Sequence, residues 1–261
     1  MLLKVNEIFG PTIQGEGSAA GRHCVFIRLA LCNLECKWCD TDYTWAFTHE
    51  KASKHLRGIV HDRGENLHEL DAQQVITRLL TKWDIYDMPT IIVISGGEPM
   101  MQQEALMPLL HELNATCCEI HIETAGTIAP QRSVSFQALT GRTLCADFDK
   151  YVTQYNVSPK LAHSGNLLGK RYKPIVLKEF AKNPKAWFKF VLRSTDDLHE
   201  VDEMVINQGI ITRRVMVMPE GVTVEGNIET ARKIEAEAIA RGYGLSFRSH
   251  ILLWPNVERG R

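Results

Sequence analysis

Residues 32–41 read Cys32-Asn33-Leu34-Glu35-Cys36-Lys37-Trp38-Cys39-Asp40-Thr41. Three cysteines thus lie within ten residues, with three residues between the first pair and two between the second. This is an unusual ligand set, because a structural zinc ion takes four ligands and a redox dithiol takes two. A cubane iron–sulfur cluster takes one thiolate per iron, so three cysteines leave one iron open to a ligand other than protein. We expect the chemistry of this chain to take place around these thiolates.

A zinc knuckle with a distant fourth ligand, such as His23 or Cys24, is the alternative interpretation of the three cysteines. Their spacing fits known zinc patterns poorly. The spacing Cys-x3-Cys-x2-Cys instead resembles the radical S-adenosylmethionine (SAM) signature. That resemblance implies that the open iron chelates the amino and carboxylate groups of SAM, and that electron transfer from the cluster cleaves SAM to a 5′-deoxyadenosyl radical.

Length and composition are those of an ordinary globular protein. The chain has 261 residues, of which 44% are apolar and 23% charged, and its formal net charge is −1. Such a charge gives no electrostatic case for nucleic-acid binding, and no apolar run is long enough to cross a membrane. The first residues lack a signal-peptide layout, and seven cysteines fit a reducing compartment better than a disulfide framework. We expect no nucleic-acid or membrane partner and a cytoplasmic location.

Apolar runs and helical patterns alternate along the chain, which predicts parallel βαβ units that curl into a partial, TIM-like barrel. The expected strands cover residues 3–9, 24–30, 90–95, 119–123, 143–148, 151–157, 187–192, 214–218 and 245–254. The expected helices cover residues 71–83, 104–113, 197–207 and 228–241, with Pro108 marking a helix start or a kink. We expect one domain over residues 1–261, with a polar insertion around 47–69 and an extended region around 128–185.

Arg28 interrupts the apolar run 24–30, and a buried guanidinium needs a partner. That partner is either a structural carboxylate such as Glu16 or a carboxylate of the substrate. Residues 10–17 contain three glycines and a proline, which predicts a loop whose backbone can approach a ligand closely; an ordinary turn is the alternative.

Asp40 and Thr41 directly follow the last cysteine, and their oxygens suit Mg2+. Spacing alone favours a different role, in which Asp40 caps a helix that starts near Thr41. The histidines of the insertion lack tight metal spacing, and we expect most of them to be solvated: His49, His55, His61 and His68.

Several short motifs lie at or just beyond the C-terminal ends of predicted strands, at Cys32, Gly96, Glu123, Ser158 and Pro219. In parallel α/β proteins these strand ends share one face, and the active site lies there. The motif Gly96-Gly97-Glu98-Pro99 occurs in many turns, so it is weak evidence by itself. It becomes more specific here because it follows a buried strand and lies downstream of the three cysteines. Its flat glycine edge suits the amino group of SAM, and Glu98 can support the loop.

Together these segments resemble the 7-carboxy-7-deazaguanine synthase family, through residues 10–17, 26–29, 32–41, 95–99, 123–127, 158–160 and 218–221. The resemblance implies a radical SAM enzyme, a carbon–nitrogen lyase with a reduced barrel and a homodimeric assembly. Its substrate is 6-carboxy-5,6,7,8-tetrahydropterin, and its product, 7-carboxy-7-deazaguanine, forms with loss of ammonia and feeds queuosine and other 7-deazapurine pathways. The implied cofactors are one 4Fe-4S cluster, SAM and Mg2+, with an electron donor such as flavodoxin or ferredoxin.

The same resemblance implies roles for individual residues. The metal ligands are Cys32, Cys36 and Cys39 for the cluster and Thr41 for Mg2+, which reverses the preference from spacing. The substrate contacts are Ile13, Gln14, Gly15, Arg28 and Ser95. The residues beside SAM are Trp38, Cys39, Asp40, Gly97, Ser158, Pro159, Lys160, Met218, Pro219, Glu220 and Gly221. The catalytic residues are Arg28, Glu123 and His250.

This chain departs from the family pattern in several places. Ser95 stands where threonine is usual and keeps the hydroxyl, whereas Ala125 replaces an asparagine and loses an amide. Residues 128–185 form a longer region than in compact members.

Two other classes of protein remain as alternatives. A glycyl-radical activase shares the three-cysteine loop but acts on a large protein, whereas Gln14, Arg28 and residues 40–41 favour a small carboxylated substrate. A zinc-stabilised interaction module would contain zinc and no iron or sulfide.

Overall fold

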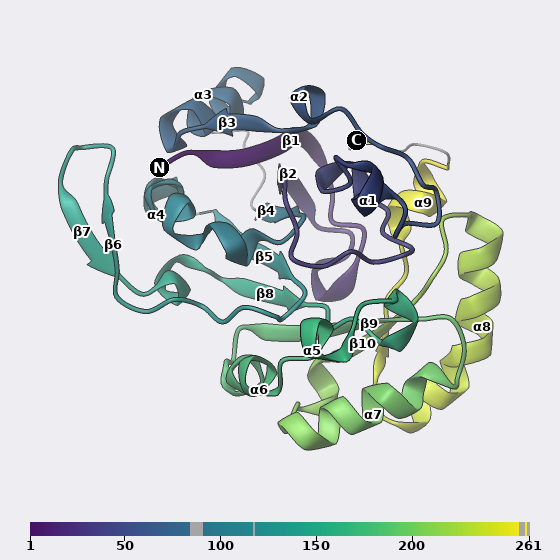
Figure 1. Cartoon of the computed structure of the whole chain (residues 1–261). Helices are drawn as coiled ribbons and strands as arrows, with labels where there is room; N and C mark the ends of the chain where they lie inside the picture. The colour runs from purple at the N-terminus through teal and green to yellow at the C-terminus, as the bar shows by residue number, and fades with distance from the viewer. Residues whose placement is uncertain (84–90, 117, 256–258, 260–261) are drawn as a thin grey trace. The chain divides into compact units, whose positions relative to one another are not determined.

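A computed structural model describes residues 1–83, 91–116, 118–255 and 259 (Figure 1). The chain forms two compact units, each assembled from three segments. Unit 1 consists of Met1–Thr12, His23–Thr124 and Pro130–Gln154, and unit 2 of Ile13–Arg22, Ala125–Ala129 and Tyr155–Arg261. Both units are mixed α/β structures; unit 1 contains parallel and antiparallel strand pairs, whereas the strand pairs of unit 2 are parallel. Within the described residues, no helix is long and apolar enough to cross a bilayer.

Five strands of unit 1 follow one another in the order β5-β4-β2-β1-β3. Their bounds are β1 Leu3–Ile13, β2 His23–Leu29, β3 His68–Leu70, β4 Ile91–Gly96 and β5 Glu119–Thr124. The pairs β2–β4 and β4–β5 are parallel, whereas β1 and β3 are antiparallel. Residues 91–94 of β4 are fully buried, as a parallel strand covered on both faces requires. Thr90, the first residue of the predicted strand, lies outside the described residues.

The longer helices of unit 1 are α3, Ala72–Lys82, and α4, Gln103–Leu113, which pack together. A capping box begins α3, because Asp71 and Gln74 exchange side-chain and backbone hydrogen bonds. Val75 and Leu79 of α3 are buried, whereas Leu80 is exposed. Pro108 lies inside α4, so it does not mark the start of that helix.

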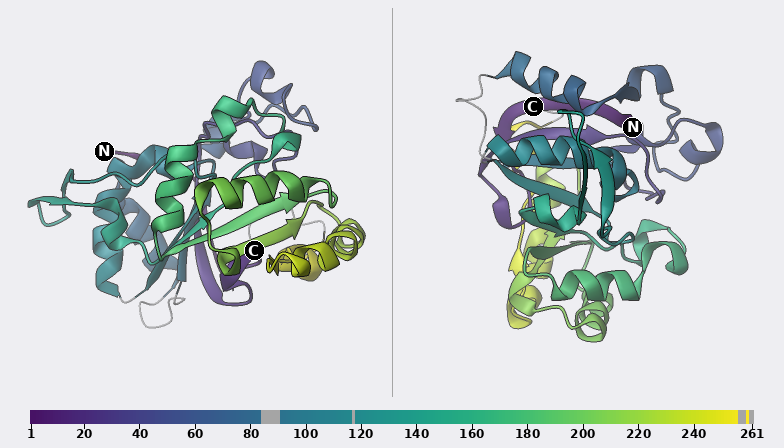
Figure 2. Two further views of the ribbon diagram at one scale, coloured as in Figure 1. Left: turned by 90° about the horizontal axis from the view of Figure 1, so that it is seen from below. Right: turned by 90° about the vertical axis from the view of Figure 1, so that its left-hand side faces the viewer.

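The insertion at 47–69 contains two single-turn helices, α1 His49–Ala52 and α2 Arg63–Asn66. Unit 1 also contains an antiparallel pair, β6 Val134–Gln137 and β7 Thr143–Ala146, and β6 was not predicted. This hairpin extends away from the other strands of unit 1 (Figures 1 and 2), and Cys145 on β7 is exposed.

The strands of unit 2 follow the order β11-β10-β9-β8, and all neighbouring pairs are parallel. Their bounds are β8 Gln154–Val157, β9 Ala186–Leu192, β10 Val215–Pro219 and β11 Gly244–Leu245. The helices are α5 Leu168–Arg171, α6 Pro174–Lys182, α7 Asp197–Gln208, α8 Val224–Ala240 and α9 Ser249–Leu253. Helix α7 packs on β9, and α8 packs on β10 and β11.

Two predicted segments differ from the structure. Residues 10–13 continue β1 instead of forming a loop, and Gly10 takes a φ of +128° that only glycine adopts readily. The predicted last strand, 245–254, is wrong, because β11 ends at Leu245 and His250 lies on helix α9. The run 251–253 contains three consecutive apolar residues, so it gave no alternation that separates a strand from a short helix.

Candidate active site

The cysteine loop of unit 1 begins shortly after β2. Cys36 is buried, whereas Cys32 and Cys39 are partly exposed. Burial raises the pKa of the Cys32 thiol, and the nearby Glu98, Cys39 and Cys36 raise it further. A positively charged metal centre at this loop would offset these effects and favour the thiolate form.

Hydrogen-bond donors approach two of these sulfurs. The Leu34 amide donates to Cys32 Sγ and the Trp45 indole to Cys39 Sγ, each at 3.4 Å. Such N–H···S bonds are one means by which proteins set the properties of iron–sulfur clusters. Among the described residues, no three Cys, His, Asp or Glu side chains converge as one metal ion requires. A cubane places each thiolate on a different iron, and the three closely spaced cysteines with N–H donors at two of the sulfurs fit such a cluster.

Gly97 lies where the backbone leaving β4 meets the start of the cysteine loop. A Cβ at this position would lie 1.8 Å from the Leu31 carbonyl oxygen, so glycine is required. The amides of Gly97 and Glu98 donate to the carbonyls of Leu29 and Leu31, both at 2.9 Å. The fully buried Glu98 accepts from the Met100 amide at 3.1 Å, which confirms its predicted role as a support of this loop.

Arg28 and Ser95 lie side by side on parallel strands, because they are register partners of β2 and β4. Ile94 pairs with Ile122, so Glu123 follows one step further along the next strand. Three residues predicted to contact substrate therefore come from neighbouring strands of unit 1. The Ser95 side chain is 2% exposed, and its hydroxyl has no hydrogen-bond partner among the described residues, as expected of a group that awaits a ligand.

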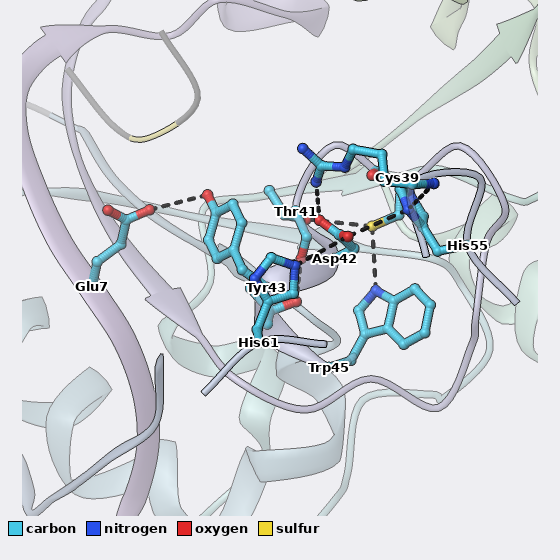
Figure 3. Close-up of polar contacts among 10 residues, drawn as sticks. Glu7, Cys39, Thr41, Asp42, Tyr43, Trp45, His55 and His61 are labelled. Atoms are coloured by element: carbon cyan, nitrogen blue, oxygen red, sulfur yellow. Dashed lines mark hydrogen bonds and ion pairs between the residues drawn. The ribbon is translucent and has the colours of Figure 1, made fainter. Parts of the chain in front are cut away.

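The partner of Arg28 is Glu7, with Nε and Oε1 2.8 Å apart, and not Glu16 as suggested above. Tyr43 donates to the same Glu7 oxygen at 3.2 Å (Figure 3). The guanidinium also lies over the Phe9 ring, 5.1 Å from its centroid. Within the described part of the chain, Glu7 is its one hydrogen-bond acceptor, so the two terminal nitrogens remain available for a carboxylate.

Asp42 is the centre of a buried network that the sequence did not predict (Figure 3). Its carboxylate is fully buried, is paired with Arg57, and lies 3.1 Å from His61 Nε2 and 3.3 Å from His55 Nδ1. The expectation that His55 is solvated is wrong, because its ring is buried and its Nε2 lies 2.8 Å from the Cys39 carbonyl. The insertion is thereby tied to the cysteine loop.

The predicted helix cap at Asp40 is absent from this part of the structure. A single 3₁₀ turn starts at Asp42, and its first position is preceded by Thr41 without a side-chain capping bond. The Thr41 hydroxyl lies 3.6 Å from Cys39 Sγ. The capping role that spacing favoured for Asp40 is therefore not found, and the Mg2+ role of Thr41 stays a prediction.

In unit 2, the loop at residues 14–16 packs against the segment around α9. A Cβ on Gly15 would lie 2.4 Å from His250 Nδ1, and the Ser249 amide donates to the Gly15 carbonyl at 2.9 Å. Glu16 pairs with Lys189 and, at 3.0 Å, with Arg248. The structure thus brings together two residues that the sequence separates by more than two hundred positions, Gly15 and His250.

Burial opposes ionisation of the Glu16 carboxyl, but Lys189, Arg248 and His250 outweigh it. Their charges hold the pKa of Glu16 well below its usual value. Glu16 is therefore a fixed anion that orients the loop beside it.

The predicted SAM-lining segments of unit 2 are also held by hydrogen bonds. Lys160 Nζ donates to Ser158 Oγ at 3.0 Å, just beyond β8. The Gly221 carbonyl, two residues after β10, accepts from Arg248 at 2.9 Å and from Asn227 at 2.8 Å. Both segments are built as ordered loops at the C-terminal ends of parallel strands.

The predicted site residues fall on both units. Those on unit 1 are Arg28, Cys32, Cys36, Trp38, Cys39, Asp40, Thr41, Ser95, Gly97 and Glu123, and those on unit 2 are Ile13, Gln14, Gly15, Ser158, Pro159, Lys160, Met218, Pro219, Glu220, Gly221 and His250. Sequence reasoning missed the residues that hold them in place, Glu7, Asp42, Tyr43, Trp45 and His55. An aspartate, a tyrosine and a tryptophan at positions 42, 43 and 45, within six residues of the last cysteine, were the available signal.

Comparisons with known proteins identify the family. Residues 13–145 match the profile described as a 4Fe-4S single cluster domain. The 7-carboxy-7-deazaguanine synthase of Pyrobaculum aerophilum is 32% identical over 257 residues, which cover 98% of this chain and 96% of the relative. That of Hyperthermus butylicus is 30% identical over 256 residues, covering 97% and 93%.

The crystal structure of QueE from Escherichia coli covers 96% of this chain and 95% of its own, with a TM-score of 0.63 and 24% identity, and so shows the same fold. The relatives from Pyrobaculum aerophilum and Hyperthermus butylicus match over nearly their whole length, which favours the synthase over both alternatives. This chain therefore belongs to the 7-carboxy-7-deazaguanine synthase family of radical SAM enzymes.

Proposed function

We propose that this enzyme converts 6-carboxy-5,6,7,8-tetrahydropterin to 7-carboxy-7-deazaguanine with loss of ammonia, in the route to queuosine. The observation that carries the substrate assignment is the row formed by Arg28, Ser95 and Glu123 at the ends of neighbouring strands. Arg28 offers two free terminal nitrogens to a carboxylate, and Ser95 offers an unpaired hydroxyl. This pairing suits a small, polar, carboxylated substrate.

Cys32, Cys36 and Cys39 would hold the 4Fe-4S cluster. When bound, the cluster and SAM supply a radical that takes a hydrogen atom from the substrate. Arg28, held by Glu7, fixes the substrate carboxylate, because a radical reaction depends on placing one C–H bond accurately. Gly97, which has no side chain, lets the backbone that follows β4 lie directly against the start of the cysteine loop.

The remaining assignments are supported by the resemblance in sequence. SAM would contact Trp38, Asp40, Gly97 and the segments 158–160 and 218–221, and Mg2+ would bind Thr41. Residues 13–15 and His250 would contact the substrate. We also propose a partial barrel forming one radical SAM domain over residues 1–261, a homodimer, a flavodoxin or ferredoxin as electron donor, and a cytoplasmic location.

The test is an anaerobic assay. The protein is reconstituted with iron and sulfide, reduced, and mixed with SAM, Mg2+ and 6-carboxytetrahydropterin; mass spectrometry should detect 7-carboxy-7-deazaguanine. A Cys36→Ala variant should make none, and Cys145→Ala, which removes an exposed cysteine outside the loop, should retain activity. Formation of 5′-deoxyadenosine without that product would show that the proposed substrate is wrong. If neither 5′-deoxyadenosine nor 7-carboxy-7-deazaguanine forms in protein with a verified cluster, the proposed radical reaction is wrong.

A further inference from the structure

Trp45 is a buried tryptophan whose indole nitrogen contacts a cluster cysteine. Its side chain is 1% exposed, and its Nε1 lies 3.4 Å from Cys39 Sγ (Figure 3). An indole N–H can only donate a hydrogen bond. The direction of this bond is therefore fixed, from the ring to the sulfur.

The surroundings of Trp45 keep the ring in this position. It packs with Ala46 and Ala52, and this small apolar cluster lies against Cys32 and Cys39. The His55 ring meets it edge-on, with centroids 6.2 Å apart and an interplanar angle of 74°. These contacts hold the indole ring beside Cys39.

His55 and Asp42 form the frame around this contact. The His55 Nδ1 accepts from the Arg57 amide at 3.1 Å, so its Nε2 carries the proton and donates to the Cys39 carbonyl. Asp42 accepts from His61 and from the Arg57 side chain. Cys39 is thus held at its carbonyl by His55 and at its sulfur by Trp45.

A donor to a cluster sulfur changes how easily the cluster accepts an electron. The added electron makes the sulfurs more negative, so the hydrogen bond becomes stronger in the reduced state. We propose that Trp45 is a positioning residue that raises the reduction potential of the cluster through its hydrogen bond to Cys39. This inference rests on the proposed role of Cys39 as a cluster ligand.

The test is Trp45→Phe in the anaerobically reconstituted protein, measured by potentiometric titration with electron paramagnetic resonance. The variant keeps an aromatic ring and loses the donor. At fixed potential, the ratio of reduced to oxidised cluster should fall about threefold or more, the factor expected when one state loses a hydrogen bond of typical net strength. Trp83→Phe, which removes an indole from the buried residue at the end of α3, should leave the midpoint unchanged.

A second measurement does not require Trp45→Phe to fold. Protein containing tryptophan labelled with ¹⁵N in the indole ring should show a weak nitrogen coupling to the reduced cluster in pulsed spectra. The coupling should persist in Trp38→Phe, which removes the other tryptophan near the cysteines and leaves Trp45 intact. An intact cluster without that coupling, or an unchanged midpoint in Trp45→Phe, would overturn the role of Trp45. Failure of wild-type protein to form any cluster would instead overturn the proposed function.

Discussion

Arg28 is a charged residue on a buried strand, and the structure explains why that position tolerates it. Glu7 binds its Nε, and the ring of Phe9 covers one face of the guanidinium. The pKa of Arg28 is raised, because Tyr43, Glu7 and Asp40 together outweigh the effect of burial. The side chain is consequently held as a permanent cation beside Ser95.

Arg28→Ala should raise the KM for the pterin substrate by about tenfold or more, the effect expected from losing a charge-assisted pair. Iron and sulfide content should not change, because Arg28 is not a cluster ligand. Glu7→Gln is the matched control, since it removes the anion but keeps the cation, and its KM should change less. An unchanged KM in Arg28→Ala would remove this residue from the substrate site.

The lowered pKa of Glu16 predicts how the stability of the folded protein depends on pH. Its pKa is lower in the folded protein than the usual 4.5, so the ionised form stabilises the fold above that value. This contribution is lost as the pH falls below 4.5 towards the folded pKa. In urea unfolding, Glu16→Gln should be less stable than wild type at pH 7, and the difference should shrink below about pH 4.5. A difference that is constant with pH would show that Glu16 acts without its charge.

At the scale of elements, the glycines after β4 determine how close two chain segments approach. Gly97 contacts the backbone between β2 and the cysteine loop, so neither partner can move aside as a side chain could. This contact couples the end of one strand to the geometry of the cysteine loop.

Gly97→Ala should therefore displace the cysteine loop and destabilise the protein by about 1–3 kcal/mol, the range found for overpacked sites. The protein should also retain less iron after gel filtration. Gly169→Ala is the control, because a Cβ there meets no atom within 4 Å. Equal stability and iron content in the two variants would contradict the close approach.

Most elements could be predicted from the sequence, because their signals are local. The apolar run of β4 and the capping box of α3 needed no tertiary information. The prediction of a strand over residues 245–254 failed because contacts with Glu16 and Gly15, near the other end of the sequence, position Arg248 and His250.

The candidate site divides in the same way. Cysteine spacing predicts the cluster ligands, and that prediction stays untested. The contact between Glu7 and Arg28 joins two strands and has no periodic pattern in the sequence that would predict it. The role of His55 depends on contacts with the Cys39 carbonyl and the Arg57 amide that no spacing rule predicts.

At the scale of the whole molecule, the chain passes between the two units several times. Unit 2 takes residues 13–22 from between β1 and β2 of unit 1, and residues 125–129 from just after β5. Neither unit is a continuous segment, so neither can be cut out of the chain without breaking the other.

We therefore expect one cooperative unfolding transition in calorimetry, with equal calorimetric and van't Hoff enthalpies. Leu79→Ala in unit 1 and Leu177→Ala in unit 2 each open a cavity at a fully buried site and should cost about 2–5 kcal/mol. Both should lower the temperature of the whole transition. Two resolved transitions, each sensitive to one of these variants, would contradict a single cooperative domain.

The exposed Cys145 on the β6–β7 hairpin has a practical consequence for handling the protein. Among the described cysteines it is the one classed as exposed, whereas Cys24 and Cys36 are buried. A maleimide fluorophore applied at limiting amounts under anaerobic conditions should react there first. The hairpin thus provides a natural attachment point for dyes or surface immobilisation that spares the thiolates on which the reaction depends.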